Sequence, residues 1–310
     1  MSVRRFVALG TASQVPTRHR NHNGYMLDWD GEGVLFDPGE GTQRQMIMAG
    51  VSASRIHHIC ITHFHGDHCL GLAGVIQRLS LDKVTRPVHI YYPASGQVYL
   101  DRLRNASIFH DVTDLKLVPI RQPGVLYAGK NFRLEAVALD HSVPCYGYRI
   151  CEPDDVRMLP EKLAAYKIQG RDIGTLKKAG RIQVEGVDVT VDMVSEVKPG
   201  QVMAFVMDTR DCEGARQLGH RADMLVIEST YLSSETEEAI AHGHLTAAQA
   251  ATIALDAKAR LLVLTHFSQR YTSIEPFVSE AVKIFANAVA VSDGDVVEMP
   301  ARLPADAPAI

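Results

Sequence analysis

Four potential metal ligands fall within six residues, directly after a short apolar run. The run is Ile59-Cys60-Ile61, and the polar segment is His63-Phe64-His65-Gly66-Asp67-His68. A short apolar run followed by turn residues is typical of a buried strand. So many polar side chains cannot all face a core without partners. The chain therefore has to fold so that one strand ends at a polar site.

The spacing within this segment favours two metal ions over one. A turn after the strand can point His63 and His65 to one side while Asp67 and His68 point to another. Imidazole and carboxylate ligands suit zinc, manganese or iron, and the absence of paired thiols nearby argues against a cysteine-rich structural zinc site. A lone His-x-His pair would be weak evidence. The complete motif at a strand end predicts a centre with two divalent cations, and we expect the zinc pair of a hydrolase.

The rest of the chain predicts an α/β layer fold, because short β runs alternate with amphipathic segments. The expected strands are 34–36, 59–61, 88–92, 203–206 and 261–264. The expected helices are 41–49, 71–80, 95–104, 213–219, 246–258 and 275–286.

A faint internal repeat predicts two similar half-domains. The apolar runs 34–36 and 204–207 are followed by Asp37 and Asp208, and a later run in each half ends in Thr-His-Phe, at 62–64 and 265–267. We expect a single domain over 1–310, with a first half over about 1–150 and a second over about 201–310. The polar, turn-rich stretch at about 151–200 is expected to be a small inserted arm.

Composition limits the class of protein. The chain has 310 residues, 46% of them apolar, which is enough for a large core. No apolar run approaches the roughly 18 residues that span a bilayer. The five cysteines are odd in number and include no C-x-x-C pair, as suits a reducing compartment. We therefore expect a cytoplasmic protein without a membrane partner, in which the cysteines fill the core.

The charge distribution is uneven. A net charge of -4 argues against a uniformly basic nucleic-acid binder, yet residues 1–27 contain four arginines and no acid. Residues 157–181 contain seven basic and two acidic residues, a local charge of +5. Such clusters could steer a polyanion to one face, or they could be two solvated surfaces without a special role.

Several separated motifs occur in an order that resembles the ribonuclease Z branch of the metallo-β-lactamase superfamily. Besides the metal motif, they are Gly10–Ser13 with Val15–Asn21, Phe36–Gln43, Asp140-His141, Met207–Arg210, Ile227–Tyr231, Gly243–Ala247 and Leu264–Tyr271. The resemblance implies a four-layer αββα fold. It also implies an endoribonuclease that removes the 3′ trailer of precursor tRNA.

The same resemblance implies a full ligand set. His63, His65 and His141 would hold one metal ion, Asp67, His68 and His266 the other, and Asp208 would bridge both. The local motif supports four of these seven independently. For His141, Asp208 and His266 only the family order argues for a ligand, because a strand-end Asp or His is as often a turn or cap residue.

The implied chemistry is attack of a metal-bound hydroxide on a phosphodiester, which leaves a 3′-hydroxyl on the tRNA. Asp67 would orient the hydroxide and accept a proton, and His244, paired with Glu228, would protonate the leaving oxygen. Another account of His244 is a helix-entry residue before Thr246 and Gln249, which form a capping box. The two accounts are compatible.

The resemblance also suggests contacts with RNA. Ser268 and Arg270 resemble a phosphate clamp, since a guanidinium offers two donors to phosphate oxygens. Tyr271 could stack on the RNA or pack in the protein. A second backbone-phosphate contact would come from Thr17, Arg18, Arg20 and Asn21. For Arg18 and Arg20, solvated surface is an equally good account.

The match departs from the family pattern in three places. The arm segment 167–178 keeps its basic character but lacks the proline residues of the family's arm, which grips the tRNA elbow. Ser229 and Leu245 stand where the family usually has Ala and a small hydroxyl residue. None of these changes removes a ligand or the proton donor, but together they weaken the inference of a tRNA substrate.

The sequence is compatible with three functions. The first is a zinc-dependent endoribonuclease with two zinc ions per chain (manganese or iron possible), acting on precursor tRNA as a homodimer. The alternative is a dinuclear-metal phosphodiesterase or esterase acting on a small substrate. The third, a non-catalytic metal-stabilised RNA-binding or scaffold protein, is disfavoured because every ligand and the proton donor are present.

Overall fold

A computed structural model describes residues 4–302. Within these residues the chain divides into two compact units. The larger unit comprises 4–151 and 202–300, and the smaller comprises 152–201 with 301–302.

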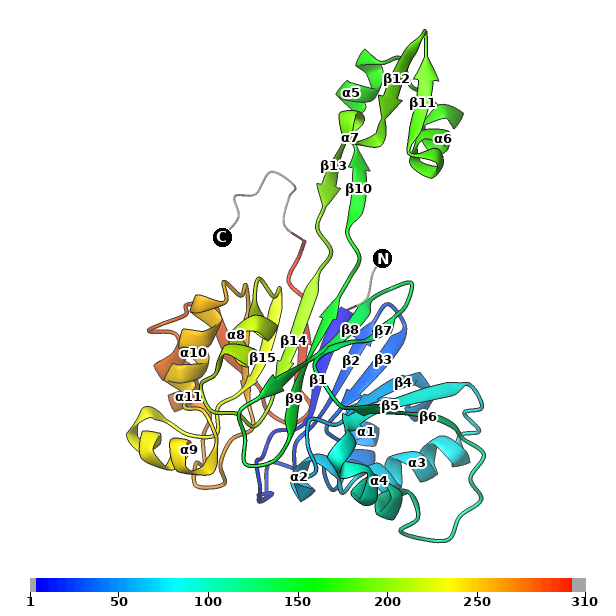
Figure 1. The fold of residues 1–310 in the computed structure, drawn as a ribbon. Coiled ribbons are helices and arrows are strands. Elements are labelled where there is room, and N and C mark those ends of the chain that lie inside the picture. The colour runs from blue at the N-terminus through cyan, green and yellow to red at the C-terminus, as the bar shows by residue number, and fades with distance from the viewer. Residues whose placement is uncertain (1–3, 303–310) are drawn as a thin grey trace. The chain divides into compact units, whose positions relative to one another are not determined.

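The larger unit contains two seven-stranded sheets (Figure 1). The first has the strand order β18-β1-β2-β3-β4-β5-β6. Its strands are β1 (Arg4–Gly10), β2 (Gly24–Trp29), β3 (Glu32–Phe36), β4 (Ile56–Cys60), β5 (Pro87–Pro93), β6 (Asp114–Ile120) and β18 (Val296–Glu298). The helices of this half are α1 (Thr42–Met48), α2 (Gly66–Cys69), α3 (Leu72–Leu81) and α4 (Gln97–Arg104). Apolar side chains of α1, α3 and α4 pack on the outer face of the sheet.

The second sheet has the order β17-β16-β15-β14-β9-β8-β7. Its strands are β7 (Gly124–Ala128), β8 (Arg133–Leu139), β9 (Cys145–Cys151), β14 (Val202–Val206), β15 (Met224–Glu228), β16 (Leu262–Thr265) and β17 (Ala288–Ala290). The helices are α8 (Glu213–Gly219), α9 (Thr236–His242), α10 (Ala247–Asp256) and α11 (Glu275–Ala281). The alanine-rich face of α10 packs with α8 and α11 on the outer side of this sheet.

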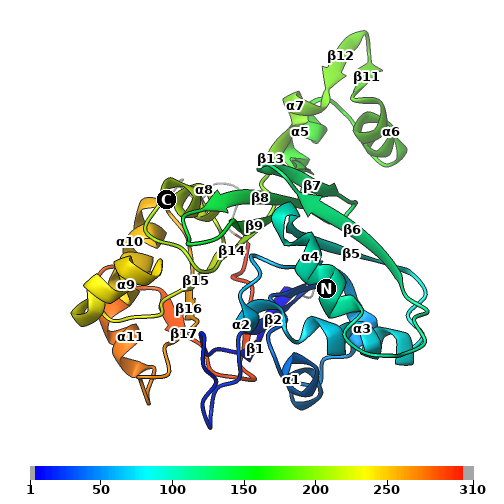
Figure 2. The ribbon, with the colours of Figure 1, turned by 60° about the horizontal axis from the view of Figure 1, so that its bottom comes forward.

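The inner faces of the two sheets form the main core. Phe36 of β3 stacks on Phe205 of β14 with ring centres 4.4 Å apart, and Tyr25 of β2 meets the same ring edge-on at 5.3 Å. Such aromatic pairs across a layer bury large apolar areas. Helices, sheet, sheet and helices therefore form four layers, which the view in Figure 2 also shows. The expected αββα fold is confirmed.

The sheets do not coincide with the two halves of the sequence. β7, β8 and β9 precede residue 152 but belong to the second sheet, and the C-terminal β18 pairs with β1 in the first. Each half thus contributes strands to the other sheet. The expected strands and helices all occur, although α11 ends at Ala281, five residues before the expected end. The short helices α2 and α9 were not expected from the sequence.

The smaller unit has its own strands and helices. β10 (Asp155–Met158) pairs with β13 (Ser195–Lys198), and β11 (Arg181–Val184) pairs with β12 (Val187–Thr190). The β11–β12 turn is Glu185-Gly186, both with positive φ, as a tight two-residue hairpin requires. Three short helices, α5 (Pro160–Ala165), α6 (Arg171–Ala179) and α7 (Val191–Val194), complete the unit. Its small apolar core contains Leu163, Ile168, Leu176, Val189 and Val194.

Two expectations about class can be compared with the structure. Within residues 4–302, no helix is both long enough and apolar enough to cross a membrane. All five cysteines are free; Cys60, Cys69 and Cys145 are buried, whereas Cys151 and Cys212 are half-buried. Packing in the core is therefore confirmed for three of the five.

A buried histidine makes the fold sensitive to acid. His58 of β4 is 3% exposed and lies against Tyr91, Tyr127 and Phe132. Burial, followed by the positive charges of His89, His57 and Arg86, lowers the pKa of His58 to about 3. In the unfolded chain its pKa returns to about 6.5. Below pH 6.5 His58 becomes protonated in the unfolded chain but stays neutral in the folded protein. The free energy of unfolding therefore falls as the pH drops from 6.5 to 3.

We expect His58→Phe to be less sensitive to acid than the wild type. Between pH 7 and pH 4, His58 lowers the free energy of unfolding of the wild type by on the order of 3 kcal/mol, and the substitution abolishes this part of the fall. Urea unfolding of both proteins at the two pH values measures the difference. An equal loss of stability in the two proteins would contradict this account.

Candidate metal centre and active site

The site lies where parallel strands end. β3 runs parallel to β4, and β14, β15 and β16 are parallel to one another, so their carboxyl ends meet at one edge of each sheet. Asp37 follows β3 and Asp208 follows the equivalent β14, both with φ 42°, and His266 follows β16 with φ 64°. Positive φ is uncommon for residues other than glycine, although Asp and His adopt it more often than most, and it is often found at functional sites. The repeated strand–Asp pattern therefore corresponds to a repeated backbone geometry.

One cluster joins the first three predicted ligands to Asp208. His63 Nε2 lies 3.0 Å from His65 Nδ1, and His141 Nε2 lies 3.3 Å from the same atom. The Oδ2 atom of Asp208 is 3.6 Å from His63 Nε2 and 3.8 Å from His141 Nε2. One ligand atom of each residue lies within 4.8 Å of the others, which is compatible with one shared cation.

A second cluster joins the remaining ligands to the same aspartate. His68 Nε2 lies 3.3 Å from Asp67 Oδ2 and 3.3 Å from Asp208 Oδ2. His266 Nε2 lies 3.6 Å from Asp67 Oδ2 and 3.1 Å from Asp208 Oδ1. Asp208 therefore belongs to both clusters, and the structure brings together all seven residues expected as ligands.

The donor atoms fit cations better than they fit one another. Among the residues that the structure describes, His68 Nε2, His266 Nε2 and Asp208 Oδ1 are buried without a hydrogen-bond partner. Such orphaned atoms are costly unless something compensates them. Burial raises the pKa of Asp208, but His266, His68 and His244 outweigh it and hold this pKa well below the usual value. An ionised carboxylate among imidazoles is a suitable dinuclear metal site.

The Asp37 carboxylate orients two histidine rings in the first half of the chain, His68 directly and His63 through Thr62. His68 Nδ1 lies 2.9 Å from Asp37 Oδ2, and His63 Nδ1 lies 3.0 Å from the hydroxyl oxygen of Thr62. That hydroxyl donates to the same Asp37 oxygen at 2.7 Å, and the Thr62 N–H donates to the other at 2.7 Å. Outer partners of this kind fix the tautomer and orientation of a ligand histidine.

The second half uses a similar arrangement. His266 Nδ1 lies 2.9 Å from the Thr230 hydroxyl, which donates to Glu228 Oε2 at 2.6 Å. His141 Nδ1 donates to the Gly243 carbonyl at 3.0 Å. Gly243 has φ 78°, and a Cβ there would lie 2.8 Å from His141 Nδ1, so a side chain at this position would displace the His141 ring.

Removing the Asp37 charge should weaken one metal more than the other. Asp37→Asn keeps the shape but turns an acceptor that serves His68 and Thr62 into an amide. We expect affinity for the cation held by His68 to fall about 10- to 100-fold. Titration with a chelator would then show one equivalent of metal leaving earlier than in the wild type. Simultaneous release of both equivalents at the wild-type chelator concentration would contradict this.

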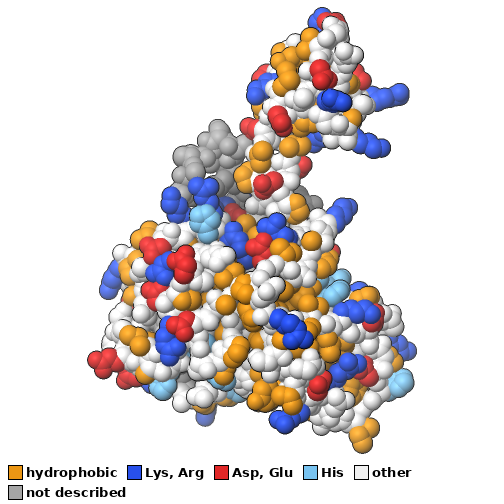
Figure 3. Space-filling model, in the orientation of Figure 1, with side chains coloured by type: hydrophobic (Ala, Val, Ile, Leu, Met, Phe, Trp, Pro, Cys, Tyr) orange, Lys and Arg blue, Asp and Glu red, His pale blue; other side chains and the backbone are white. Residues whose placement is uncertain are grey.

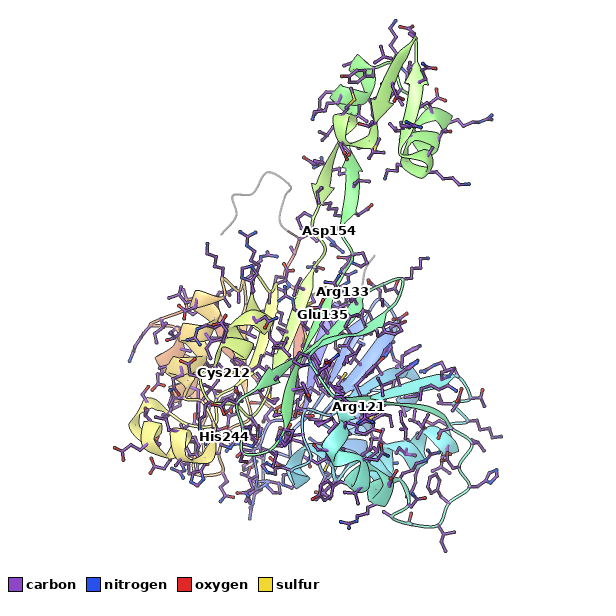
Figure 4. All side chains as sticks on the ribbon, viewed as in Figure 1. Arg121, Arg133, Glu135, Asp154, Cys212 and His244 are labelled. Atoms are coloured by element: carbon purple, nitrogen blue, oxygen red, sulfur yellow. The ribbon has the colours of Figure 1, made fainter. Side chains whose placement is uncertain are left out.

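Beside the ligands lies a histidine–carboxylate pair. His244, between α9 and α10 (Figure 4), places Nδ1 3.0 Å from Glu228 Oε1 and 4.0 Å from Asp208 Oδ2. Burial lowers the pKa of His244, but Glu228 and Asp208 outweigh it and raise the value to about 9. Thr246 and Gln249 form the capping box of α10 next to it, so both accounts of this segment apply. A hydrogen bond from Nδ1 to Glu228 leaves Nε2 available for a substrate.

A pocket of about 640 Å³ opens over these groups. Its lining includes Asp67, Asp208 and His244 together with Ser268 and Arg270, two of the expected phosphate contacts. Arg270 is exposed, and its Cζ lies 4.9 Å from the ring centre of Tyr231. Tyr271 packs edge-on against Phe277 at 4.9 Å, and its hydroxyl donates to Glu235 at 2.7 Å. Of the two expectations for Tyr271, the structure shows packing.

The expected phosphate contacts at 17–21 differ in their surroundings. Arg18 is exposed, whereas Arg20 is 8% exposed and donates to the carbonyl oxygens of Ser268 and Tyr271. Arg20 is therefore not the exposed phosphate contact that the sequence suggests, because its side chain is buried and its Nη2 donates to two backbone carbonyls. The Thr17 hydroxyl accepts from the Arg20 N–H at 2.9 Å, and the Asn21 amide donates to Glu40 at 2.7 Å.

Several residues of the site were not expected from the sequence. Asp37, Thr62 and Thr230 orient the ligand histidines, and Tyr231 lines the pocket beneath Arg270. The repeat of Asp37 with Asp208 carried a signal for the first, since both end equivalent strands. The repeated Thr-His-Phe at 62–64 and 265–267 marked Thr62, but neither residue type nor spacing assigns a role at the site to Thr62, Thr230 or Tyr231.

Comparisons with known proteins agree with this geometry. The family model described as "Metallo-beta-lactamase superfamily" matches residues 17–148. Ribonuclease Z of Nocardia farcinica is 58% identical over 294 residues, which are 94% of this chain and 96% of that protein. Ribonuclease Z of Streptomyces coelicolor is 56% identical, with 91% and 92% covered.

More distant proteins extend the match. Ribonuclease Z of Chlamydia trachomatis serovar L2 is 46% identical, with 97% of this chain and 99% of that protein covered. Among solved structures, human tRNase Z, short form, superposes with a TM-score of 0.69 at 25% identity, covering 96% of this chain and all of that one. The resemblance seen in the sequence motifs is confirmed: this chain belongs to the ribonuclease Z family of the metallo-β-lactamase superfamily.

Proposed function

We propose that this protein is a metal-dependent endoribonuclease that removes the 3′ trailer of precursor tRNA and leaves a 3′-hydroxyl on the tRNA. The observation that carries the proposal is the arrangement around Asp208. Two ligand clusters share this carboxylate, and the His244–Glu228 pair lies 4.0 Å from it at the same pocket. Relatives at 46–58% identity bear the name ribonuclease Z.

The cations are proposed to be zinc, held by His63, His65 and His141 on one side and Asp67, His68 and His266 on the other, with Asp208 between them. Two such ions lower the pKa of water and neutralise charge on a phosphoryl group. Imidazole-rich sets of this kind also bind manganese or iron, so metal analysis of the purified protein is the direct check. A major metal other than zinc would contradict this part of the proposal.

Side chains of the protein would carry out the remaining steps, which are orienting the water, transferring protons and binding the phosphate. Asp67, 8% exposed at the pocket, would orient the attacking water and accept its proton. His244 would donate a proton from Nε2 to the departing 3′ oxygen, while Glu228 holds Nδ1 and stabilises the charged ring. Arg270 would bind a non-bridging phosphate oxygen at the pocket rim.

The smaller unit would bind the RNA through its backbone phosphates. Lys and Arg side chains project from its surface (Figure 3), and no ion pair within residues 4–302 involves Lys162, Arg171, Lys178 or Arg181. Unpaired surface cations are available to phosphates and carry affinity without base specificity. Contacts of this kind suit a folded RNA that is recognised by its shape.

We also propose that the protein works as a homodimer. Ile47 and Met48 on α1 and Val98 and Tyr99 on α4 expose apolar side chains on the helical layer of the first sheet. Exposed apolar side chains gathered on one layer are candidates for a protein interface. Light scattering should return twice the mass of one chain, and a single-chain mass at micromolar concentration would contradict the proposal.

The substrate is tested by comparing two phosphodiesters. Zinc-loaded protein is incubated with a 3′-extended precursor tRNA and, in parallel, with bis(p-nitrophenyl) phosphate, and kcat/KM is measured for each. The proposal predicts efficient cleavage of the tRNA at a single position directly after the discriminator base. The 640 Å³ pocket would also admit a small diester. Turnover of that compound without cleavage of tRNA would instead establish a small-molecule phosphodiesterase.

A further inference from the structure

Two loops that line the pocket are joined to each other. The first, residues 11–22, contributes Ser13, Gln14, Val15 and His22 to the lining, and the second, residues 266–271, contributes His266 and 268–270. Their backbones pair directly: Ser13 N–H donates to the Phe267 carbonyl at 3.1 Å, and Phe267 N–H donates to the Thr11 carbonyl at 2.8 Å. The position of one loop therefore constrains the other.

Arg20 makes the side-chain connection between them. Its Nη2 donates to the Ser268 carbonyl at 3.1 Å and to the Tyr271 carbonyl at 2.6 Å. These two carbonyls bracket Gln269 and Arg270, so one guanidinium holds both ends of the turn that carries Arg270. Hydrogen bonds from a charged donor are stronger than those between neutral groups.

The loop that carries Arg20 is itself anchored. The Thr17 hydroxyl accepts from the Arg20 N–H at 2.9 Å, and the Asn21 N–H donates to Asp293 Oδ2 at 2.7 Å. Asp293 also accepts from the Thr11 hydroxyl at 2.8 Å and from the Gln45 amide at 3.0 Å. The Arg20 guanidinium thus extends from an anchored loop. Removing it would release the turn at 268–271 but leave the loop at 11–22 in place.

The turn matters because of where it places Arg270. The exposed guanidinium of Arg270 lies over Tyr231, a ring that is 7% exposed. The ring centre of Tyr231 lies 6.0 Å from that of His244. A cation held on a buried aromatic face is pre-organised, which lowers the entropic cost of binding a phosphate.

We propose that Arg20 is a positioning residue: by holding the Ser268 and Tyr271 carbonyls it fixes Arg270 over Tyr231, where Arg270 meets a substrate phosphate beside His244. This inference rests on the proposed cleavage of precursor tRNA and on the proposed phosphate contact of Arg270. It assigns Arg20 a role through another residue, in place of a contact with RNA. Arg18, two residues earlier and exposed, remains available for direct contact.

A double-mutant cycle on the metal-loaded protein tests the proposal. Arg20→Met removes the donors but keeps the length of the side chain, and Arg270→Ala removes the clamp. We expect each single change to lower kcat/KM on precursor tRNA about 10- to 100-fold. The double variant should lose no more than the worse single variant, because Arg20 acts only through Arg270. Arg18→Met is the matched comparison. The factor by which it lowers kcat/KM should be the same with and without Arg270→Ala, so the two factors should multiply in the double variant.

Other outcomes would overturn the proposal. Arg20→Met could lower kcat/KM by the same factor in the wild type and in Arg270→Ala. That result would mean that Arg20 acts on the whole fold or on the metals. Wild-type kcat/KM in Arg20→Met would show that the turn needs no support. Arg20→Lys, which keeps the charge but replaces the guanidinium with a single ammonium, should give an intermediate loss of kcat/KM, and it tests the proposal if Arg20→Met does not fold. Failure of the wild type to cleave precursor tRNA would refute the proposed function instead.

Discussion

Asp208→Ala should remove both metal ions and the activity together. Asp208 is 2% exposed, and its two oxygens lie 3.1–3.8 Å from the ligand nitrogens of His63, His68, His141 and His266. Without Asp208, each cluster loses the carboxylate that the two share. The histidines of both clusters then lose the negative charge that they face. We expect metal content well below two per chain. We also expect kcat/KM on precursor tRNA to fall on the order of 1000-fold or more, since the cations supply several kcal/mol of charge stabilisation.

Metal analysis and cleavage kinetics on the same preparation check this prediction. Asp208→Asn, which keeps the volume of the side chain, separates loss of charge from a cavity. Asp101→Ala, an exposed aspartate on α4, is the matched control and should keep two metals and wild-type rates. Retention of two tightly bound ions in both Asp208 variants would refute the bridging role.

His244→Ala should separate catalysis from metal binding. His244 lines the pocket and pairs with Glu228, but it stands outside the two clusters centred on Asp208. Loss of a positioned proton donor typically costs about 100- to 10,000-fold in rate. We therefore expect kcat to fall by such a factor while metal content stays near two per chain. The KM for precursor tRNA should change little, because the proposed role of the residue is to protonate the departing oxygen.

The control for this prediction is His110→Ala, an exposed histidine in the loop after α4. It should change neither rate nor metal content. His244 also belongs to a third group of potential ligands with Glu228 and His266. A drop in the metal content of His244→Ala would therefore assign His244 to the ligand set and remove it from the role of proton donor.

The sequence predicts the local part of the site well. His63, His65, Asp67 and His68 lie within six residues at one strand end, so their chemistry is visible without knowledge of the fold. His141, Asp208 and His266 are separated from that motif by 73 residues or more. Only the order of the family motifs identifies them before the strand ends are seen to meet.

Tertiary contacts explain what the sequence could not predict. Whether Arg20 faces solvent depends on two carbonyls 248 and 251 residues further along the chain. The orienting roles of Thr62 and Thr230 depend on hydroxyl directions set by Asp37 and Glu228. Likewise, the residue types of β7 to β9 do not reveal which of the two sheets these strands join.

The chemistry of the cut ends tests the central claim most directly. Zinc-loaded protein is given a 3′-extended precursor tRNA, and the new termini of both products are identified by mass spectrometry. Attack by water at this site, with His244 protonating the departing 3′ oxygen, predicts a 3′-hydroxyl on the tRNA and a 5′-phosphate on the trailer. A 2′,3′-cyclic phosphate on the tRNA would mean attack by the neighbouring ribose hydroxyl, and it would contradict the account.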